Sequence, residues 1–343
     1  MISWLIKEKV MDKTEITKYK DNLLNNLRLR GEYDAAVGLR KKVLLVEGTT
    51  DQKFIEHVKG TDTRCLSVAD FMRARSAFST SRTPAPAPYN SKVVITTILK
   101  HIAWFPDYFD FPKGAETWPL YGLVDNDFDD CSEFARVTKL FFTDTHDLET
   151  MMIATDSELL TRLKQCSISS DDVKAALYIA NQLAAFRQAI KENGNLSPGL
   201  INASDGTIAF EEFTDGNMVN LAKLVQYINI KADNPLSREK LKKTREAITK
   251  ALKKKLNKEG FWKKSLESFA VTTDSDFWMD VNGHDVLSAI CYKNPSIREV
   301  FINQGGYSQN RDFEFALSEA YDYDCLKKTK LYTKLQEAGL LKE

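Results

Sequence analysis

The segment KVLLVEGTTD, from Lys42 to Asp51, is a short apolar run that ends in acidic residues. A second segment, LYGLVDNDFDD, from Leu120 to Asp130, has the same arrangement. Short apolar runs bounded by turn residues are typical of strands buried on both faces. In a parallel sheet both strands would present their acids at the carboxyl edge, where the sites of open α/β sheets form. The two segments therefore predict an α/β fold with a site at that edge.

Further elements fit between and after these two strands. The apolar and turn patterns predict a helix at 51–59, a strand at 63–68, a helix at 92–104 and a fourth strand at 137–142. Strands that alternate with helices favour a parallel sheet with right-handed crossovers. We therefore predict a parallel sheet flanked by helices, in a catalytic domain spanning 41–157.

The rest of the chain has a different pattern. Residues 1–40 are predicted to form an N-terminal helical arm, and residues 158–343 a mainly helical region. Its expected helices are 170–191, 219–230, 238–259, 283–292 and 313–326, with a short strand at 208–213 before a TDGN turn. Three alternating prolines in Pro84 to Pro88 predict an exposed loop or insertion within 79–90.

The charge is polarised along the chain although the formal net charge is zero. Residues 106–158 hold thirteen acids against three basic residues, whereas 238–264 hold twelve basic residues against three acids. The first segment can collect cations and the second can collect phosphates. No run approaches the ~20 apolar residues of a membrane helix, and the first residues lack a secretory signal. Five scattered cysteines without a CxxC pair fit a reducing compartment, so a cytoplasmic protein without a membrane association is expected.

The acids at the two strand ends suit a hard divalent cation. Glu47, Asp125 and Asp127 offer the carboxylate oxygens that Mg²⁺ or Mn²⁺ binds. In an extended segment Asp125 and Asp127 would point to the same side, and Asp51 could add a ligand for a second ion. Either pattern alone is also typical of turns and helix caps, so the prediction depends on their combination.

The segment TDTHDLE follows the fourth predicted strand. One interpretation is a helix start, in which Asp144 or Thr145 caps the helix and the following acids face its positive end. In the functional interpretation Asp147 or, preferably, Glu149 completes a second metal site, and His146 contacts a phosphate or moves a proton. The sequence is compatible with both interpretations.

The segment NGHD, from Asn282 to Asp285, is a turn before an apolar helix. Asp285 has the position of an N-cap, and His284 could reach the edge of the sheet as an accessory residue. His57 and His101 lie within helical patterns, which favours a structural role.

The basic segment 238–264 is either a solvated helix face or a surface for nucleic acid. Its charge excess, together with Phe261 and Trp262 as stacking residues, favours binding to an RNA or DNA backbone. The residues predicted to contact nucleic acid are Lys242, Lys243, Arg245, Lys250, Lys253, Lys254 and Lys255.

Glu47 in VEGTTD and Asp125 and Asp127 in VDNDFD resemble the acidic motifs of the Toprim fold of topoisomerases, primases and OLD-type nucleases. Within that fold the segments VEGTTDQKF, GLVDNDFDD, THDLE and NGHD are similar to those of the DUF4435 group. The Pro84–Pro88 insertion departs from the common Toprim core.

The resemblance implies metal ligands at Glu47, Asp125 and Asp127, with Asp51 and Glu149 as second-site ligands. It also implies an anti-phage effector of the PARIS kind, held by an ABC-type ATPase similar to AriA until a trigger releases it to cleave host tRNA. A DNA nuclease of OLD type, a primase-like polymerase and a non-catalytic partner-binding module remain alternatives. The sequence leaves a homodimer open.

Overall fold

A computed structural model describes residues 42–68, 91–92, 95–96, 99, 120–127, 139–163, 168–194, 213–227, 238–257, 276–297 and 311–342. The predicted N-terminal arm and the proline-rich loop lie outside these residues. The chain divides into two compact units. The first comprises 1–143 and 327–343, and the second comprises 144–326.

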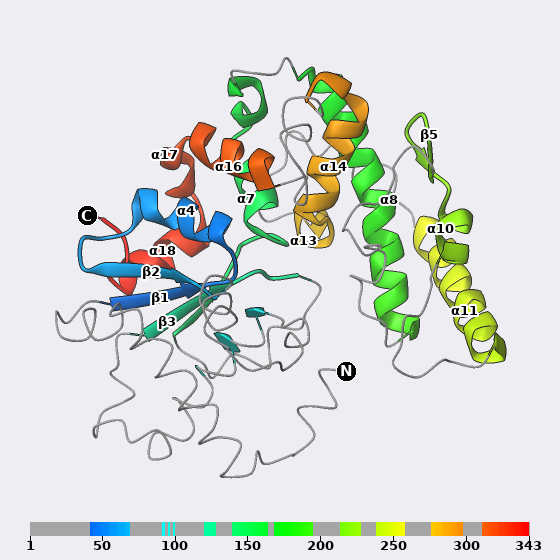
Figure 1. Cartoon of the computed structure of the whole chain (residues 1–343), viewed down its shortest axis with the longest axis horizontal. Helices are drawn as coiled ribbons and strands as arrows, with labels where there is room; N and C mark the ends of the chain where they lie inside the picture. Colours follow the sequence, from blue (N-terminus) through cyan, green and yellow to red (C-terminus); the bar gives the residue numbers. More distant parts are fainter. Residues whose placement is uncertain are drawn as a thin grey trace, which may run out of the picture. The chain divides into compact units, whose positions relative to one another are not determined.

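The first unit contains a parallel four-stranded sheet. Its elements are β1 Lys42–Val46, α4 Thr49–Val58, β2 Thr63–Ser67, β3 Leu120–Val124 and β4 Leu140–Phe142 (Figure 1). The strand order is β2-β1-β3-β4, and every neighbouring pair is parallel. This confirms the prediction of an α/β fold with a parallel sheet and flanking helices.

Burial explains why these segments form strands. Val43 to Val46 are buried, as expected for a strand covered on both faces. Gly122 of β3 allows a helical segment to approach closely, because a Cβ there would overlap the side chains of Ile95 and Leu99. The sheet is therefore packed tightly around β1 and β3, whose ends carry the acidic residues.

The end of the chain belongs to this first unit and not to the helical region predicted for 158–343. Helix α18, Lys330–Glu337, contacts β4, and Leu341 forms an antiparallel bridge with Lys59. The Lys42 ammonium donates to the carbonyl of Ala338 over 2.6 Å. The predicted boundary at 157 also differs from the division after Thr143. These contacts join residues almost 300 positions apart, so the local sequence pattern gave no sign of them.

We expect Thr63→Val to weaken this attachment. The Thr63 hydroxyl is buried and donates to the Leu340 carbonyl over 2.9 Å, whereas valine has the same shape and no donor. Leu340 keeps its bond from the Gly60 amide, so the free energy of unfolding should fall by about 1 kcal/mol in urea titrations. The substitution Thr61→Val, at an exposed position of the same turn, is the control. An equal loss in both variants would contradict the prediction.

The second unit is mainly helical. Its elements are α7 Leu148–Thr155, the 3₁₀ helix η4 Leu159–Arg162, α8 Ser170–Gly194, α10 Leu221–Tyr227, α11 Arg238–Leu256, α13 Asp276–Asp280, α14 Gly283–Lys293, α16 Arg311–Ala320 and α17 Tyr323–Leu326. Helix α8 contacts both α14 and α11, and its buried apolar residues form much of the core.

Two details of the second unit differ from expectation. The helix predicted over 313–326 is two helices, α16 and α17, separated at Tyr321–Asp322, where the Asp322 amide donates to the buried carboxylate of Asp156. The TDGN turn lies inside a hairpin of β5 Thr214–Asp215 and β6 Met218–Val219. Gly216 has a positive φ of 61° in this turn, a backbone conformation that favours glycine. Most of the strand predicted at 208–213 lies outside the described residues.

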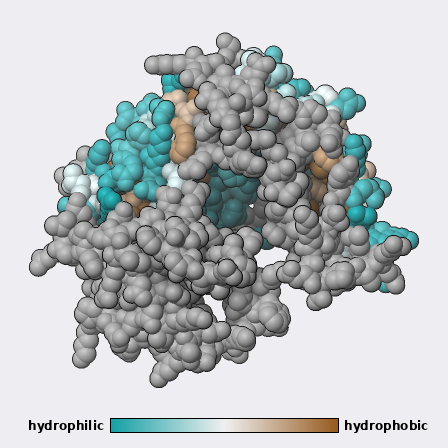
Figure 2. All heavy atoms as spheres, in the orientation of Figure 1, coloured by the Kyte–Doolittle hydropathy of each residue, from teal (hydrophilic) through white to brown (hydrophobic). Residues whose placement is uncertain are grey.

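On the face shown in Figure 2, the described residues are mostly hydrophilic, with smaller hydrophobic areas between them. Met218 is the large hydrophobic side chain that stands out as exposed among them. Within the described part of the chain, no helix has the length and apolar character needed to span a membrane.

Candidate functional site

Glu47 and Asp125 meet at the carboxyl ends of adjacent strands. Glu47 follows β1 and Asp125 follows β3, and the backbone amide of Asp125 donates to Glu47 Oε1 over 2.9 Å. The chain runs from β1 outward to β2 and then returns to the other side of β1 at β3, so the strand order reverses between β1 and β3. Ligands of open α/β sheets bind at this reversal, which makes the two acids the centre of a candidate site.

Asp127 also lies near Glu47 and Asp125, but its backbone does not have the extended conformation that was predicted. Strand β3 ends at Val124, and Asp127 has a positive φ of 48°. The extended-strand argument that placed Asp125 and Asp127 on one side is therefore wrong, because the chain turns after Asp125. The turn is held by Asn126, whose amide donates to the Thr143 hydroxyl over 3.0 Å at the end of β4.

Lys92 is a site residue that the sequence did not reveal. Its buried ammonium donates to the carbonyls of Asp125 and Asn126, over 2.6 and 3.3 Å, and lies 3.1 Å from Asp127 Oδ2. The Thr96 hydroxyl bonds to the Lys92 carbonyl, which continues the helix predicted from residue 92. No motif marks this lysine, since only the packing of its helix against β3 brings it to the acids.

Asp51 has a structural role beside Glu47. Its carboxylate accepts the backbone amide of Gly48 over 2.7 Å, which caps the start of α4. The negative charge still acts on Glu47, so Asp51 contributes to the field of the site. Its prediction as a second-site ligand stays a prediction.

Glu47 carries a strongly perturbed pKa. Desolvation and the charges of Asp127 and Asp51 raise its pKa to about 8, against the lowering effects of the Asp125 hydrogen bond and of Lys92. Near neutral pH the carboxyl is therefore mostly protonated without a cation. Perturbed acids of this kind concentrate at functional sites, because a bound cation or a substrate supplies the missing positive charge.

Hard divalent cations take carboxylate oxygens, although among the described residues the side chains already close enough to hold one ion are Glu149, His284 and Glu314, and not the acids of this edge. Glu47, Asp125 and Asp127 supply carboxylate oxygens, and nearby carbonyls and water can complete the coordination that Mg²⁺ or Mn²⁺ prefers. The excess negative charge that raises the pKa of Glu47 is the physical reason that a cation would be favoured there.

In the second unit, Asp147 caps α7. Its carboxylate accepts the Thr150 amide over 2.9 Å and the Gly283 amide over 2.6 Å. The cap is therefore Asp147 and not Asp144 or Thr145. Burial favours the neutral acid, but the hydrogen bond and charge of His146 outweigh it, so the pKa of Asp147 lies well below its ordinary value.

His146 lies beneath the surface next to this cap. Its side chain is buried, with Nδ1 3.0 Å from Asp147 Oδ2, and its backbone amide donates to the Trp278 carbonyl. A residue that moves a proton at a phosphate must reach the substrate. The burial argues against the predicted catalytic role and favours a role in holding Asp147.

Glu149 and His284 lie together in this unit. A ligand atom from each, and one from Glu314 of α16, lie within 4.8 Å of one another. His284 Nδ1 is 2.9 Å from Glu314 Oε1. Glu314 was not singled out from the sequence, although the helical period places it on the buried face of α16 with Phe313 and Leu317.

Asp285, predicted as an N-cap and an accessory site residue, forms a buried ion pair instead. The cap of α14 is Asn282, which accepts the Asp285 amide over 3.2 Å. The Asp285 carboxylate receives two bonds of 2.6 Å from the guanidinium of Arg187 on α8. Arg187 was missed because a cation inside an apolar helix face has no partner that the local sequence identifies.

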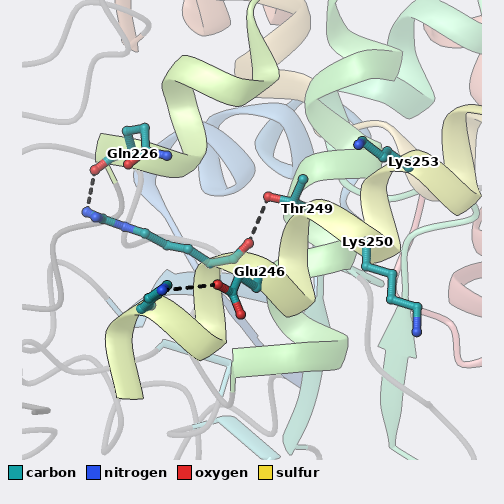
Figure 3. A pocket seen from close by; sticks show the side chains of 7 residues that line it. Gln226, Glu246, Thr249, Lys250 and Lys253 are labelled. Carbon is teal, nitrogen blue, oxygen red and sulfur yellow. Dashed lines mark hydrogen bonds and ion pairs between the residues drawn. The ribbon is translucent and has the colours of Figure 1, made fainter. Parts of the chain in front are cut away.

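The basic helix α11 borders a groove of about 690 Å³ lined by Gln226, Lys242, Arg245, Glu246, Thr249, Lys250 and Lys253 (Figure 3). Ile248 and Leu252 of this helix are buried, as the solvated-face interpretation expects. Lys250, Lys253 and Lys254 are exposed, whereas Lys255 pairs with Glu192 of α8 over 2.7 Å. The exposed lysines remain candidates for phosphate contacts, while Lys255 holds α11 on α8.

Comparisons with known proteins leave the chain without a matched relative. No protein-family model matches it, and neither a curated protein nor a solved structure is detectably similar.

Proposed function

We propose that the protein is a metal-dependent nuclease of the Toprim type. The observation that carries the proposal is the position of Glu47, Asp125 and Asp127 after adjacent strands at the strand reversal of a parallel sheet, where the Asp125 amide bonds to Glu47 and the charge of Asp127 acts on it. Acids gathered at such a position suit phosphoryl transfer, because hydrolysis of a phosphodiester needs stabilisation of negative charge.

The three carboxylates would hold Mg²⁺ or Mn²⁺. When bound, the ion supplies charge stabilisation at a scissile phosphate and a lower pKa for an attacking water. Glu47 is oriented by the Asp125 amide, and Lys92 fixes the turn that carries Asp125 and Asp127 through bonds to two carbonyls. The chain's own residues thus hold Glu47 and the backbone that carries the two aspartates.

The substrate in this proposal is nucleic acid, with tRNA favoured over DNA by the resemblance alone. The exposed lysines of α11 support binding to phosphates. From the same resemblance we propose a cytoplasmic anti-phage effector similar to AriB, released from an AriA-like ABC-type ATPase and with a homodimer as its candidate active state.

The test is cleavage of total tRNA and plasmid DNA by purified protein in Mg²⁺ or Mn²⁺, with EDTA and Asp127→Asn as controls. Cleavage that is lost in both controls but kept by Asp62→Asn, an exposed acid outside the site, supports the proposal. A folded Asp127→Asn protein with wild-type activity would contradict it. Co-expression with an ABC-type ATPase tests whether an inactive preparation is held in a dormant state.

A second candidate function is a non-catalytic partner-binding module. The observation that favours it is the Lys92 ammonium, which already offsets part of the negative charge at Asp127. On this alternative Mg²⁺ or Mn²⁺ would change the stability of the protein without supporting cleavage, and Lys92→Met would destabilise the fold without exposing any metal-dependent activity.

Removing the exposed charges of α11 should weaken nucleic-acid binding. In the variant Lys250→Ala, Lys253→Ala, Lys254→Ala, we expect the slope of log Kd against log salt to fall by roughly 2 to 3, because three phosphate contacts disappear. Fluorescence anisotropy with labelled tRNA in EDTA measures binding without cleavage. The control removes three exposed lysines elsewhere, Lys328, Lys330 and Lys334. Equal effects of the two triple variants would contradict a specific role for α11.

A further inference from the structure

We propose that Glu149, His284 and Glu314 form a binding site for a divalent transition-metal ion, complete within the second unit. The three residues come from the first turns of three helices, α7, α14 and α16. One ligand atom from each lies within 4.8 Å of the other two, a separation that a single ion can bridge. The proposal does not depend on Glu47, Asp125 and Asp127, which lie in the first unit, but it does use Glu149, for which the resemblance implied a second nuclease site.

The backbone around His284 is held in place by contacts on both sides. The Gly283 amide donates to Asp147 Oδ2 over 2.6 Å, and Asn282 caps the helix that carries His284. A Cβ at Gly283 would overlap the Asp147 carboxylate and the Cβ of Glu149. The glycine therefore allows α14 to begin directly against α7, which places the imidazole next to Glu149. Such fixed ligands reduce the entropy lost when an ion binds.

The charges around the cluster favour a cation. Glu149 and Glu314 are 5% and 7% exposed, and Asp147 lies buried behind them. His146 and His284 act on Asp147, and His284 also lies against Glu314. Buried carboxylates of this kind are stabilised by pairing or by a metal ion.

The negative charge of these carboxylates acts on the pKa of His284. Desolvation lowers the pKa of the imidazole, but the Glu314 hydrogen bond and the carboxylates of Glu149, Glu314 and Asp147 outweigh it and raise the pKa to about 10. A bound ion would replace the 2.9 Å contact between His284 Nδ1 and Glu314 Oε1. The side chain of His284 is 57% exposed, which gives an ion a route from solvent.

The donor types indicate the class of metal. One imidazole nitrogen and two carboxylates suit Zn²⁺ and Mn²⁺, whereas Mg²⁺ prefers oxygen donors alone and retains its waters. The order of affinities for such mixed sites places Zn²⁺ above Mn²⁺. We therefore expect Zn²⁺ to bind most tightly and Mg²⁺ to be a poor competitor.

The test measures metal binding by the full chain after treatment with EDTA and dialysis. We expect a saturable Zn²⁺ that Glu47→Gln retains, and at least a ~100-fold weaker affinity for that ion in His284→Ala and Glu314→Gln, by competition with a chromophoric chelator. His57→Ala and Glu319→Gln, an exposed histidine and an exposed acid on α16, are matched controls. Co²⁺ should give a visible absorption band that His284→Ala lacks.

Because His284 is largely exposed, its replacement should leave the metal-free fold intact, which circular dichroism checks independently of binding. Absence of saturable Zn²⁺ binding by the wild-type chain would overturn the proposal. An unchanged affinity in a folded His284→Ala protein would overturn it as well. Loss of the ion in Glu47→Gln would assign the metal to the acids of the first unit instead.

Discussion

Replacing Glu47 by glutamine is expected to stabilise the metal-free protein and to abolish metal-dependent cleavage. The folded-state pKa of about 8 lies above the ordinary value of 4.5, so the folded protein keeps the proton after the unfolded chain has lost it. Stability contributed by the protonated carboxyl is therefore lost as the pH rises from about 4.5 to about 8. Glutamine stays neutral throughout this window, and its amide oxygen can still accept the Asp125 amide.

The stabilisation by Glu47→Gln should be near zero at pH 4 and largest above pH 8. A pKa shift of this size corresponds to roughly 5 kcal/mol in full, and we expect about 2 kcal/mol because Glu47 keeps some contact with solvent. Urea unfolding across this pH range measures it. The control Glu56→Gln, an exposed acid on α4 that pairs with Lys59, should change stability by less than about 0.5 kcal/mol.

With Mg²⁺ or Mn²⁺ present, the wild type should become more stable than the Glu47→Gln variant. Mg²⁺ or Mn²⁺ would stabilise the wild type by displacing the Glu47 proton, with an affinity that rises with pH up to about 8. The glutamine variant should show little such stabilisation, and its cleavage rate should fall by at least about 10²-fold. A variant that is more stable at pH 8 yet cleaves at the wild-type rate would separate the burial of Glu47 from catalysis and remove it from the metal site.

Replacing Asp285 by alanine is expected to be the most destabilising single change described. Arg187 and Asp285 are 7% and 4% exposed and share two bonds of 2.6 Å between α8 and α14. Desolvation lowers the pKa of Arg187, but Asp285 outweighs it and keeps the guanidinium charged. Without Asp285 this charge is buried without compensation, which should cost about 3–5 kcal/mol in the free energy of unfolding.

The double variant Arg187→Met, Asp285→Leu is the decisive comparison. It removes both charges and fills the space with apolar side chains, so it should be more stable than Asp285→Ala alone. Asp171→Ala, which removes an exposed partner of Lys174 on the same helix α8, should cost less than about 0.5 kcal/mol. If Asp285→Ala lost metal binding or cleavage without losing stability, the predicted accessory role of Asp285 would replace this structural one.

Much of the first unit could be predicted from the chain because its signals are local. The apolar runs before Glu47 and Asp125 are long enough for one strand each, and the helical segment between β1 and β2 fits a parallel crossover. Strands of one parallel sheet end at the same edge, so the meeting of these two acids followed from their positions alone. The mainly helical character of the second unit followed in the same way from its apolar period.

The roles of individual polar residues depended on tertiary contacts. A carboxylate near a helix start can cap the helix, bind a metal or pair with a buried cation, and the sequence pattern is the same in each case. Asp147 is a cap because Gly283 and Thr150 reach it, and Asp285 is an ion-pair partner because α8 brings Arg187 to it.

The sequence by itself determined the parallel sheet and the two acids at its switch point, because periodicity and strand length act over a few residues. Only the tertiary structure decided that Lys92 joins those acids, that Glu314 faces His284, and that the end of the chain returns to Lys59. These contacts bring together residues that are distant along the chain, and packing of whole helices and strands selects them.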